Sequence, residues 1–273
     1  MLYKNDNETP NETIFGLEAA QLKFGYNSLS ELGWELSKYN CKKILLVVDP
    51  ILHNFQITQK ILNQIKQSKI EVIIFDNISV EPTLESFDIA SKFSLDNSFD
   101  LIISAGGGST IDTAKVMNLI KVCGGKIMDY VNAPIGKGYQ PKTKLLPLIA
   151  IPTTSGSGSE ATTVAVLDIP KLKVKTGISH RFLRPTLALV DPELSKTTPS
   201  GVTASAGLDV ICHAIESFIS KPYYKRVKPN SPDKRPPYQG SNPVSDIWSM
   251  KAIELGGKFL SRAVISGEDI EAR

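Results

Sequence analysis

Residues 101–112, LIISAGGGSTID, decide the fold that this sequence predicts. The run Leu101–Ala105 is apolar almost throughout and has the length of a strand buried on both faces. Three consecutive glycines follow it, and a helical pattern then continues over Ile111–Lys121. Glycine permits a tight turn and a close approach to the backbone. The stretch therefore predicts a strand, a tight turn and a helix in immediate succession.

The sequence on both sides of this unit alternates in the same way. Helical patterns are expected over Ile57–Lys66 and Leu84–Leu95. Apolar runs that predict further strands are Ile44–Val48, Val72–Phe75, Leu148–Ile151, Thr163–Leu167 and Leu187–Val190. Runs that are apolar throughout indicate strands covered on both faces, which is typical of parallel sheets flanked by helices. We therefore predict an α/β fold with a doubly wound, mostly parallel sheet.

The pattern changes after the last of these runs. Residues 199–220 predict one helix, and Val244–Val264 predicts a helix pair or one long helix. A proline-rich, basic segment, 221–243, separates them. We predict an α/β dinucleotide-binding domain over 1–196 and the first part of an all-α metal-binding domain, incomplete, over 197–273. Apolar helix faces in the second part predict self-association, and hence a possible homo-oligomer.

Bulk properties exclude several partners. A net charge of +3 over 273 residues is too small to indicate nucleic acid. No apolar run approaches the roughly 18 residues of a membrane-spanning helix, so no membrane partner is expected. The widely spaced Cys41, Cys123 and Cys212 indicate a reducing compartment without disulfides. The first dozen residues resemble neither a signal peptide nor a mitochondrial presequence.

The glycine turn is a candidate anion site. Gly106, Gly107, Gly108 and Ser109 stand where a helix begins, and a helix start offers free N–H groups and positive potential to a pyrophosphate. The pattern is not GxGxxG, so that motif gives no support. The alternative is a plain turn, with Ser109 as N-cap and Asp112 in a capping-box-like role.

A second loop, PTTSGSGSE (152–160), also follows an apolar run. Its small and hydroxylated residues, among them Thr153, Thr154 and Ser157, could line a ligand crevice at the sheet edge; the alternative is a flexible linker. Asp49, after the run Ile44–Val48, could bind a ribose 2′-hydroxyl and favour NAD over NADP. The alternative for Asp49 is a turn residue.

Asp209 and His213 are four residues apart in a helical pattern, so they share one face and could hold a divalent cation such as iron(II), manganese or zinc. The alternative is a surface pair. His53 and His180, the other two histidines, lie on no neighbouring helical segment. Two ligands do not by themselves make a catalytic metal site.

Four motifs, in order, resemble the iron-containing (group III) alcohol dehydrogenases from about Leu22 to the end. They are GGGSTIDTAK (106–115), PTTSGSGSEAT (152–162), LVDPEL (189–194) and SAGLDVICHAIESF (205–218). APIGKG (133–138) and RPPYQGSNPVSDIW (235–248) resemble the hydroxyacid–oxoacid transhydrogenase subfamily more narrowly. The resemblance implies a dehydroquinate-synthase-like N-terminal domain. It assigns Asp209 and His213 to a metal, and the cofactor NAD to Asp49, Gly106, Gly107, Gly108, Ser109, Asp112, Thr153, Thr154, Ser157 and Lys175.

The resemblance also implies a reaction. Hydride would pass from 4-hydroxybutyrate to 2-oxoglutarate through bound NAD and a divalent metal, with Fe(II) expected before Zn. Substrates would be small hydroxy and oxo acids, and segment 221–243 could recognise their carboxylates or be a solvated loop. A mitochondrial location is implied, with a cytoplasmic one as the alternative.

Two other functions remain open. One is an ordinary NAD-dependent iron-type alcohol dehydrogenase. The other is a catalytically inactive short isoform that binds only nucleotide or partner subunits, because the family's further histidine ligands would lie beyond Arg273.

Overall fold

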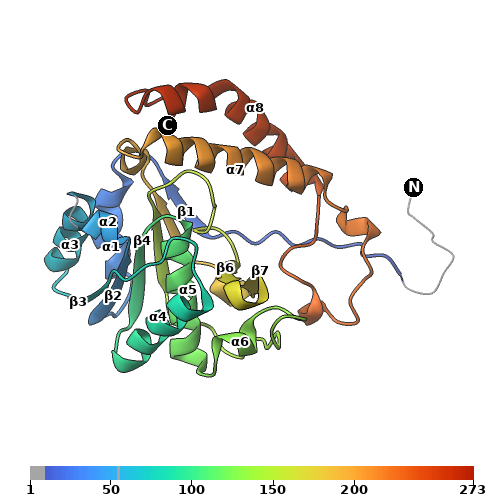
Figure 1. Cartoon of the computed structure of the whole chain (residues 1–273), viewed down its shortest axis with the longest axis horizontal. Helices are drawn as coiled ribbons and strands as arrows, with labels where there is room; N and C mark the ends of the chain where they lie inside the picture. The colour runs from blue at the N-terminus through green and yellow to red at the C-terminus, as the bar shows by residue number, and fades with distance from the viewer. Residues whose placement is uncertain (1–9, 54–55) are drawn as a thin grey trace.

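The structure, a computed structural model, describes residues 10–53 and 56–273. The expectation of no presequence in the first dozen residues falls largely on residues outside this range, as does the side chain of His53. Six parallel strands in the order β1-β8-β5-β4-β2-β3 form the central sheet of the described chain (Figure 1). Their bounds are β1 (Gln21–Phe24), β2 (Lys43–Val48), β3 (Glu71–Phe75), β4 (Leu101–Gly106), β5 (Leu148–Pro152) and β8 (Leu187–Val190).

Helices cover both faces of this sheet. One face carries α1 (Leu32–Ser37) and α3 (Gln56–Gln67), whose buried leucines and isoleucines pack on Ile44, Ile103 and Ile149. The other face carries α4 (Leu84–Asp96) and α5 (Gly108–Cys123), which pack on Leu45 and Ile102. All six residues of β4 are buried. The predicted doubly wound, parallel α/β fold is confirmed.

The remaining short elements connect these layers. They are α2 (Pro50–His53), α6 (Ile127–Tyr130), η1 (Ser28–Glu31), η2 (Pro170–Leu172), η3 (Arg181–Leu183), η4 (Pro192–Ser195), η5 (Tyr223–Lys225) and η6 (Pro232–Lys234). Cys41, Cys123 and Cys212 are free cysteines.

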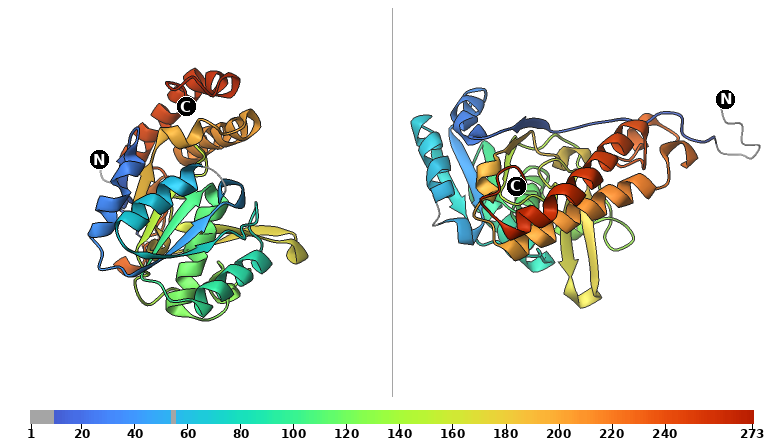
Figure 2. Two further views of the ribbon diagram at one scale, coloured as in Figure 1. Left: turned by 90° about the vertical axis from the view of Figure 1, so that its left-hand side faces the viewer. Right: turned by 90° about the horizontal axis from the view of Figure 1, so that it is seen from above.

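One predicted strand belongs to a different sheet. β6 (Val164–Ile169) pairs antiparallel with β7 (Val174–Ser179), and the two form a hairpin outside the parallel sheet. Figure 2 shows this hairpin, in yellow, projecting from the body of the molecule. The burial of β6 alternates along the strand, which distinguishes it from the continuously buried β4. The interpretation of Thr163–Leu167 as a strand of the main sheet is therefore wrong, and β1 and β7 were not predicted.

Two long helices, α7 (Ser200–Ile219) and α8 (Pro243–Ile265), pack on each other above the carboxyl edge of the sheet (Figure 1). Their approach depends on glycines: a Cβ on Gly207 would lie 2.2 Å from Leu260 Cδ1, and one on Gly256 would lie 2.8 Å from Ile211 Cγ1. The predicted segment 244–264 forms one long helix, α8, and not a helix pair. The change from sheet to helices falls between β8 and α7, and a domain boundary at residue 196 stays a prediction.

By length and composition alone, α7 could cross a membrane, with a mean hydropathy of 1.3. The sequence pattern did not reveal this, because serine, threonine and glycine interrupt the apolar residues of α7. The expected absence of a membrane partner stays a prediction. One such helix is weak evidence for a membrane. The helix also carries Asp209, His213 and Glu216 within its length and packs on α8 along one side.

Exposed apolar side chains remain on α8, as predicted. Ile247 is 68% exposed and Trp248 58% exposed. Neither self-association nor a homo-oligomer is tested by this single chain, so both stay predictions.

The connection between α7 and α8 is fastened to the N-terminal segment. Glu12 is 4% exposed and accepts hydrogen bonds from Arg235 Nε at 2.9 Å and Nη2 at 3.2 Å. The pairing with Arg235 holds the pKa of the Glu12 carboxyl below its ordinary value. Phe15 stacks at a tilt on Tyr223, with ring centroids 5.0 Å apart. The basic segment 221–243 is therefore held against residues 10–18 at several points.

The layered fold predicts that alanine substitution lowers the free energy of unfolding much more at Ile103 than at Ile89. Ile103→Ala, at a fully buried position in β4, should lower the free energy of unfolding by about 2–5 kcal/mol because it leaves a cavity between layers. Ile89→Ala, at a 48% exposed position on α4, should change it by less than about 0.5 kcal/mol. Urea denaturation measures both. Equal losses would contradict the described layers.

Candidate functional site

The two predicted loops meet at the carboxyl edge of the sheet. Gly106 of β4 pairs in register with Pro152 of β5, and Thr153 N donates to Gly106 O at 3.1 Å. A Cβ on Gly108 would lie 2.7 Å from Ser157 Oγ. The second loop can therefore lie against the start of α5 only because residue 108 has no side chain.

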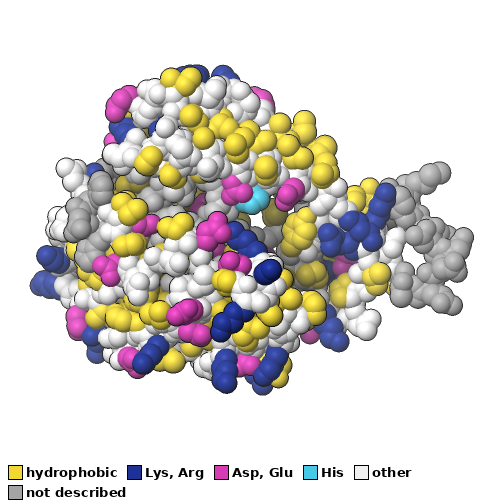
Figure 3. Space-filling view, viewed as in Figure 1, with side chains coloured by type: hydrophobic (Ala, Val, Ile, Leu, Met, Phe, Trp, Pro, Cys, Tyr) yellow, Lys and Arg dark blue, Asp and Glu magenta, His cyan; other side chains and the backbone are white. Residues whose placement is uncertain are grey.

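A cavity of about 510 Å³ opens beside this contact, beneath α7 and next to the β6–β7 hairpin. Its lining residues are Glu81, Pro82, Gly108, Ser109, Asp112, Ser157, Ser159, Thr162, Val164, Val166, Leu167, Lys175, Asp209 and His213. In Figure 3 a histidine with acidic side chains beside it borders a hollow on this face of the molecule. The predicted anion loop and the predicted metal pair thus face one cavity.

The start of α5 differs from the predicted cap. The N-cap is Gly107, whose carbonyl accepts hydrogen bonds from Thr110 N at 3.1 Å and Ile111 N at 3.2 Å. Ser109 lies inside the first turn, and its Oγ accepts from Glu81 N at 3.3 Å. Ser109 as N-cap is therefore wrong. The helix start remains open toward the cavity at Gly108 and Ser109.

Asp112 has no capping role either. It is 5% exposed; its Oδ1 accepts from Lys115 Nζ at 3.1 Å and its Oδ2 from Val166 N at 2.9 Å. Sequence reasoning missed Lys115, which is fully buried, because a lysine in a helical pattern usually indicates an exposed face. The nearby Glu160 has its pKa raised above the ordinary value, chiefly by burial.

Thr153 and Thr154 are also among the predicted cofactor residues. Thr153 is 7% exposed, its carbonyl accepts from Thr198 Oγ1 at 3.3 Å, and a Cβ on Gly107 would lie 3.5 Å from Thr154 Oγ1. These two threonines lie against the glycine turn and are not among the residues that line the cavity.

Asp49 lies at the end of β2, where its backbone N donates to Ala105 O at 3.2 Å. Its Oδ1 accepts from Ile51 N at 2.8 Å, at the beginning of α2. Asp49 is not among the residues that line the cavity. This geometry favours the turn-residue interpretation of Asp49.

Lys175 does line the cavity. Its Nζ lies 3.1 Å from Glu81 Oε2, and both side chains are more than half exposed. Glu81 itself has φ 57°, a left-handed conformation uncommon for a residue with a side chain. The exposed pair leaves the ammonium of Lys175 accessible to an anion, since such pairs contribute only about 0–1 kcal/mol.

Asp209 and His213 project from α7 into the same cavity. His213 Nε2 lies 3.6 Å from Asp209 Oδ1, and the side chains are 54% and 46% exposed respectively. Within residues 10–53 and 56–273, however, no group of three or more potential ligands is brought together. A protein metal site ordinarily uses three or four side chains, so the described residues alone do not complete one.

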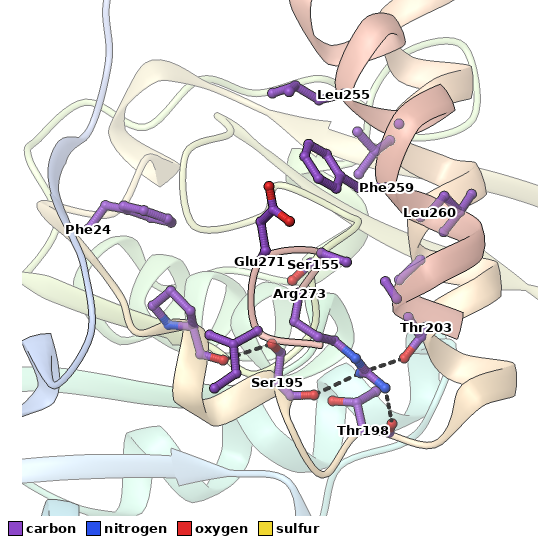
Figure 4. A pocket seen from close by; sticks show the side chains of 18 of the residues that line it. Phe24, Ser155, Ser195, Thr198, Thr203, Leu255, Phe259, Leu260, Glu271 and Arg273 are labelled. Carbon is purple, nitrogen blue, oxygen red and sulfur yellow. Dashed lines mark hydrogen bonds between the residues drawn. The ribbon is translucent and has the colours of Figure 1, made fainter. Parts of the chain in front are cut away.

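A second hollow, of about 550 Å³, lies between α7, α8 and the residues that follow α8 (Figure 4). Apolar residues such as Leu255, Phe259 and Leu260 line it. The Arg273 guanidinium donates to Ser195 O at 2.9 Å and Thr203 Oγ1 at 2.7 Å, which already engages its Nη1. The charged residues that line this hollow are Glu271 and Arg273, whereas the cavity at the glycine loop combines an open helix start with Lys175, Asp209 and His213.

The fold and the loops define a class: an α/β protein with two loops that meet at the carboxyl edge of a parallel sheet, the place where such folds bind ligands. Comparison with known families identifies it further. The model of the iron-containing alcohol dehydrogenases matches residues 19–192, and this chain belongs to that family of oxidoreductases.

Curated relatives agree with this assignment. The chain is 43% identical over 261 residues to a protein of Bos taurus and 44% identical over 262 residues to one of Rattus norvegicus, both named hydroxyacid-oxoacid transhydrogenase, mitochondrial. These alignments cover 95% of this chain and 56% of each relative. The chain thus spans about half the length of the curated relatives it matches.

Solved structures share the fold. A 1,3-propanediol oxidoreductase superposes with a TM-score of 0.81 at 29% identity, over 95% of this chain and 62% of that one. A sulfoacetaldehyde reductase from Bifidobacterium kashiwanohense, solved in complex with NAD+, gives a TM-score of 0.79 at 28% identity, over 100% and 63%.

Proposed function

We propose that this chain binds NAD along the carboxyl edge of its sheet and forms part of the active site of a hydroxyacid–oxoacid transhydrogenase. One observation carries the proposal: a single cavity is lined by the glycine loop, by Lys175 and by the Asp209–His213 pair. The relatives named for this activity support the same substrate class.

The residues present fit the dinucleotide. Gly108 and Ser109 offer open N–H groups at the start of a 16-residue helix, which suits a pyrophosphate. Ser157 lies against Gly108 from the neighbouring loop, and Lys175 supplies a positive charge to the lining of the same cavity. NAD, when bound, accepts and returns a hydride. The chain's own part is to bind and orient it beneath α7.

The metal fits only in part. Asp209 and His213 would supply one oxygen and one nitrogen to a divalent cation, and iron is proposed over zinc because of the family. Since the described residues include no third ligand beside this pair, no catalytic step is derived through the metal.

The proposed substrates are 4-hydroxybutyrate and 2-oxoglutarate. The residues that line the cavity include none of the basic segment 221–243, and Arg235 of that segment is already paired with Glu12. The proposal therefore gives this segment no part in carboxylate recognition. A mitochondrial location is proposed because the relatives carry that word in their names.

Cofactor binding tests the first half of the proposal. Gly108→Ala places a methyl group against Ser157 and should raise the Kd for NADH at least tenfold, about 1.4 kcal/mol, in a fluorescence titration. Gly201→Ala is the matched control: it lies in the first turn of α7 with nothing within 4 Å of the added Cβ, so the Kd should stay within twofold. Equal affinity in both variants would contradict the assigned cavity.

Turnover tests the second half. In the natural protein that contains this sequence, 4-hydroxybutyrate and 2-oxoglutarate supplied together, without added NAD, should give equal amounts of succinic semialdehyde and 2-hydroxyglutarate. The hydride leaves one substrate and returns to the other while the cofactor stays bound. A strict requirement for free NAD would instead identify an NAD-dependent alcohol dehydrogenase.

A second candidate function is nucleotide or subunit binding without chemistry. The observation that favours it is the two-ligand metal pair. Under this alternative the 273-residue chain should bind Fe²⁺ or Zn²⁺ only weakly in equilibrium dialysis, with His213→Ala removing what binding there is. Stoichiometric metal that survives gel filtration would exclude the alternative.

A further inference from the structure

The helix that begins at the glycine loop carries a lysine entirely inside the protein. Lys115 has 0% exposure, and its Nζ lies 3.1 Å from Asp112 Oδ1, 2.9 Å from Thr162 Oγ1 and 2.6 Å from Val164 O. An ammonium has three N–H donors. Each of them therefore has an acceptor, two of which lie outside α5.

Asp112 completes the connection from the same helix. Its second oxygen accepts from Val166 N at 2.9 Å. The Asp112–Lys115 pair thus binds Thr162, Val164 and Val166, and all three line the cavity. One side of the cavity is consequently attached to α5 through this pair.

The main sheet does not hold the hairpin. Hydrogen bonds from Asp168 N to Pro82 O at 2.8 Å and from Asn132 N to Gly177 O at 2.9 Å hold it at two points, and the Asp112–Lys115 pair holds it where β6 begins. β6 and β7 form a separate two-stranded sheet that projects from the body (Figure 2). Ala165 and Leu167 pack on Val116 of α5, but apolar packing is not directional. The ammonium donates to Thr162 Oγ1 and Val164 O, and these directional bonds fix the start of β6 against α5. The position of Lys175 on β7 depends on the position of β6, because Lys175 pairs in register with Asp168 of β6.

Stability alone does not account for the pair. Replacing a buried ion pair by apolar groups of similar volume is often neutral or stabilising, whereas removing one partner is strongly destabilising. We propose that Lys115 is a positioning residue for the cofactor cavity: it holds β6, and with it Lys175, at the distance from Ser109 that a dinucleotide requires. This inference rests on the proposed function.

The charge of Lys115 adds a pH dependence. Burial lowers the pKa of Lys115 from its ordinary 10.5; Asp112 and Glu160 oppose this shift, and Arg184 adds to it. Deprotonation removes one donor and leaves the charge of Asp112 unbalanced beside the anion site, so NADH affinity should fall as pH rises toward 10.5. Over the same range the free energy of unfolding should rise with pH. The reason is that the unfolded chain keeps the Lys115 proton up to about pH 10.5, whereas the folded chain releases it at lower pH.

The test uses three variants. Lys115→Met alone leaves a buried carboxylate without its partner and can prevent folding, so the informative variant is Asp112→Asn combined with Lys115→Met. The control is Lys121→Met on the same helix, whose Nζ donates to Asn97 O at 2.7 Å, away from the hairpin. NADH titration from pH 7 to 10, urea denaturation and amide hydrogen exchange are measured for each protein.

The double variant should keep the wild-type urea midpoint and lose the extra fall in affinity at alkaline pH. It should also bind NADH at least tenfold more weakly at pH 7.5, a result that supports positioning only together with the exchange result below, because Asp112 itself lines the cavity. Amides of residues 162–179 should exchange at least tenfold faster, and the control should match wild type. Wild-type NADH affinity in the double variant overturns the proposal, and so does a lowered urea midpoint with faster exchange throughout the chain.

If wild type itself binds no NADH, the proposed function fails, and hydrogen exchange alone decides whether Lys115 positions the hairpin. Unchanged exchange over 162–179 then overturns the positioning role as well.

Discussion

The contact between the loop after β4 and the loop after β5 is the constraint on which the site depends. Gly108 meets Ser157 so closely that a single added methyl group would collide with it. Because the two strands are adjacent and parallel, their carboxyl ends deliver both loops to one place. The same contact lies in the first turn of α5, and α5 carries the buried Asp112–Lys115 pair that binds the hairpin.

The sequence predicted those features that depend on continuous burial. β2, β4 and β5 were found because their residues are apolar almost throughout, as two helical layers require. β1 escaped notice because three of its four residues are exposed at the sheet edge. Lys115 could not be found, since its burial depends on Thr162 and Val164, which reach it only through the tertiary fold. The predicted capping roles of Ser109 and Asp112 were wrong because α5 begins earlier, at the N-cap Gly107. Asp112 instead accepts from Val166 N, a contact that only the tertiary fold creates.

α7 separates two environments with opposite character. Asp209 and His213 face the polar cavity at the glycine loop, while Gly207 and Val210 face the apolar hollow toward α8. The helix can serve both because residues three or four apart share a face, whereas residues one or two apart do not. The close packing at Gly207 and Gly256 ties the position of the metal pair to the position of α8. A change in the helix pair would therefore be transmitted to the two ligands.

The Glu12–Arg235 pair has a consequence for biosynthesis. Its partners are 223 residues apart in the chain. At a translation rate of about 5–20 residues per second, the N-terminal segment leaves the ribosome roughly 10–45 s before its partner is made. During that interval Glu12 and Phe15 lack their native partners Arg235 and Tyr223, although the sheet strands that precede these partners in the chain can already assemble. Nascent chains of this protein therefore pass through a period in which the N-terminal segment cannot yet make these native contacts.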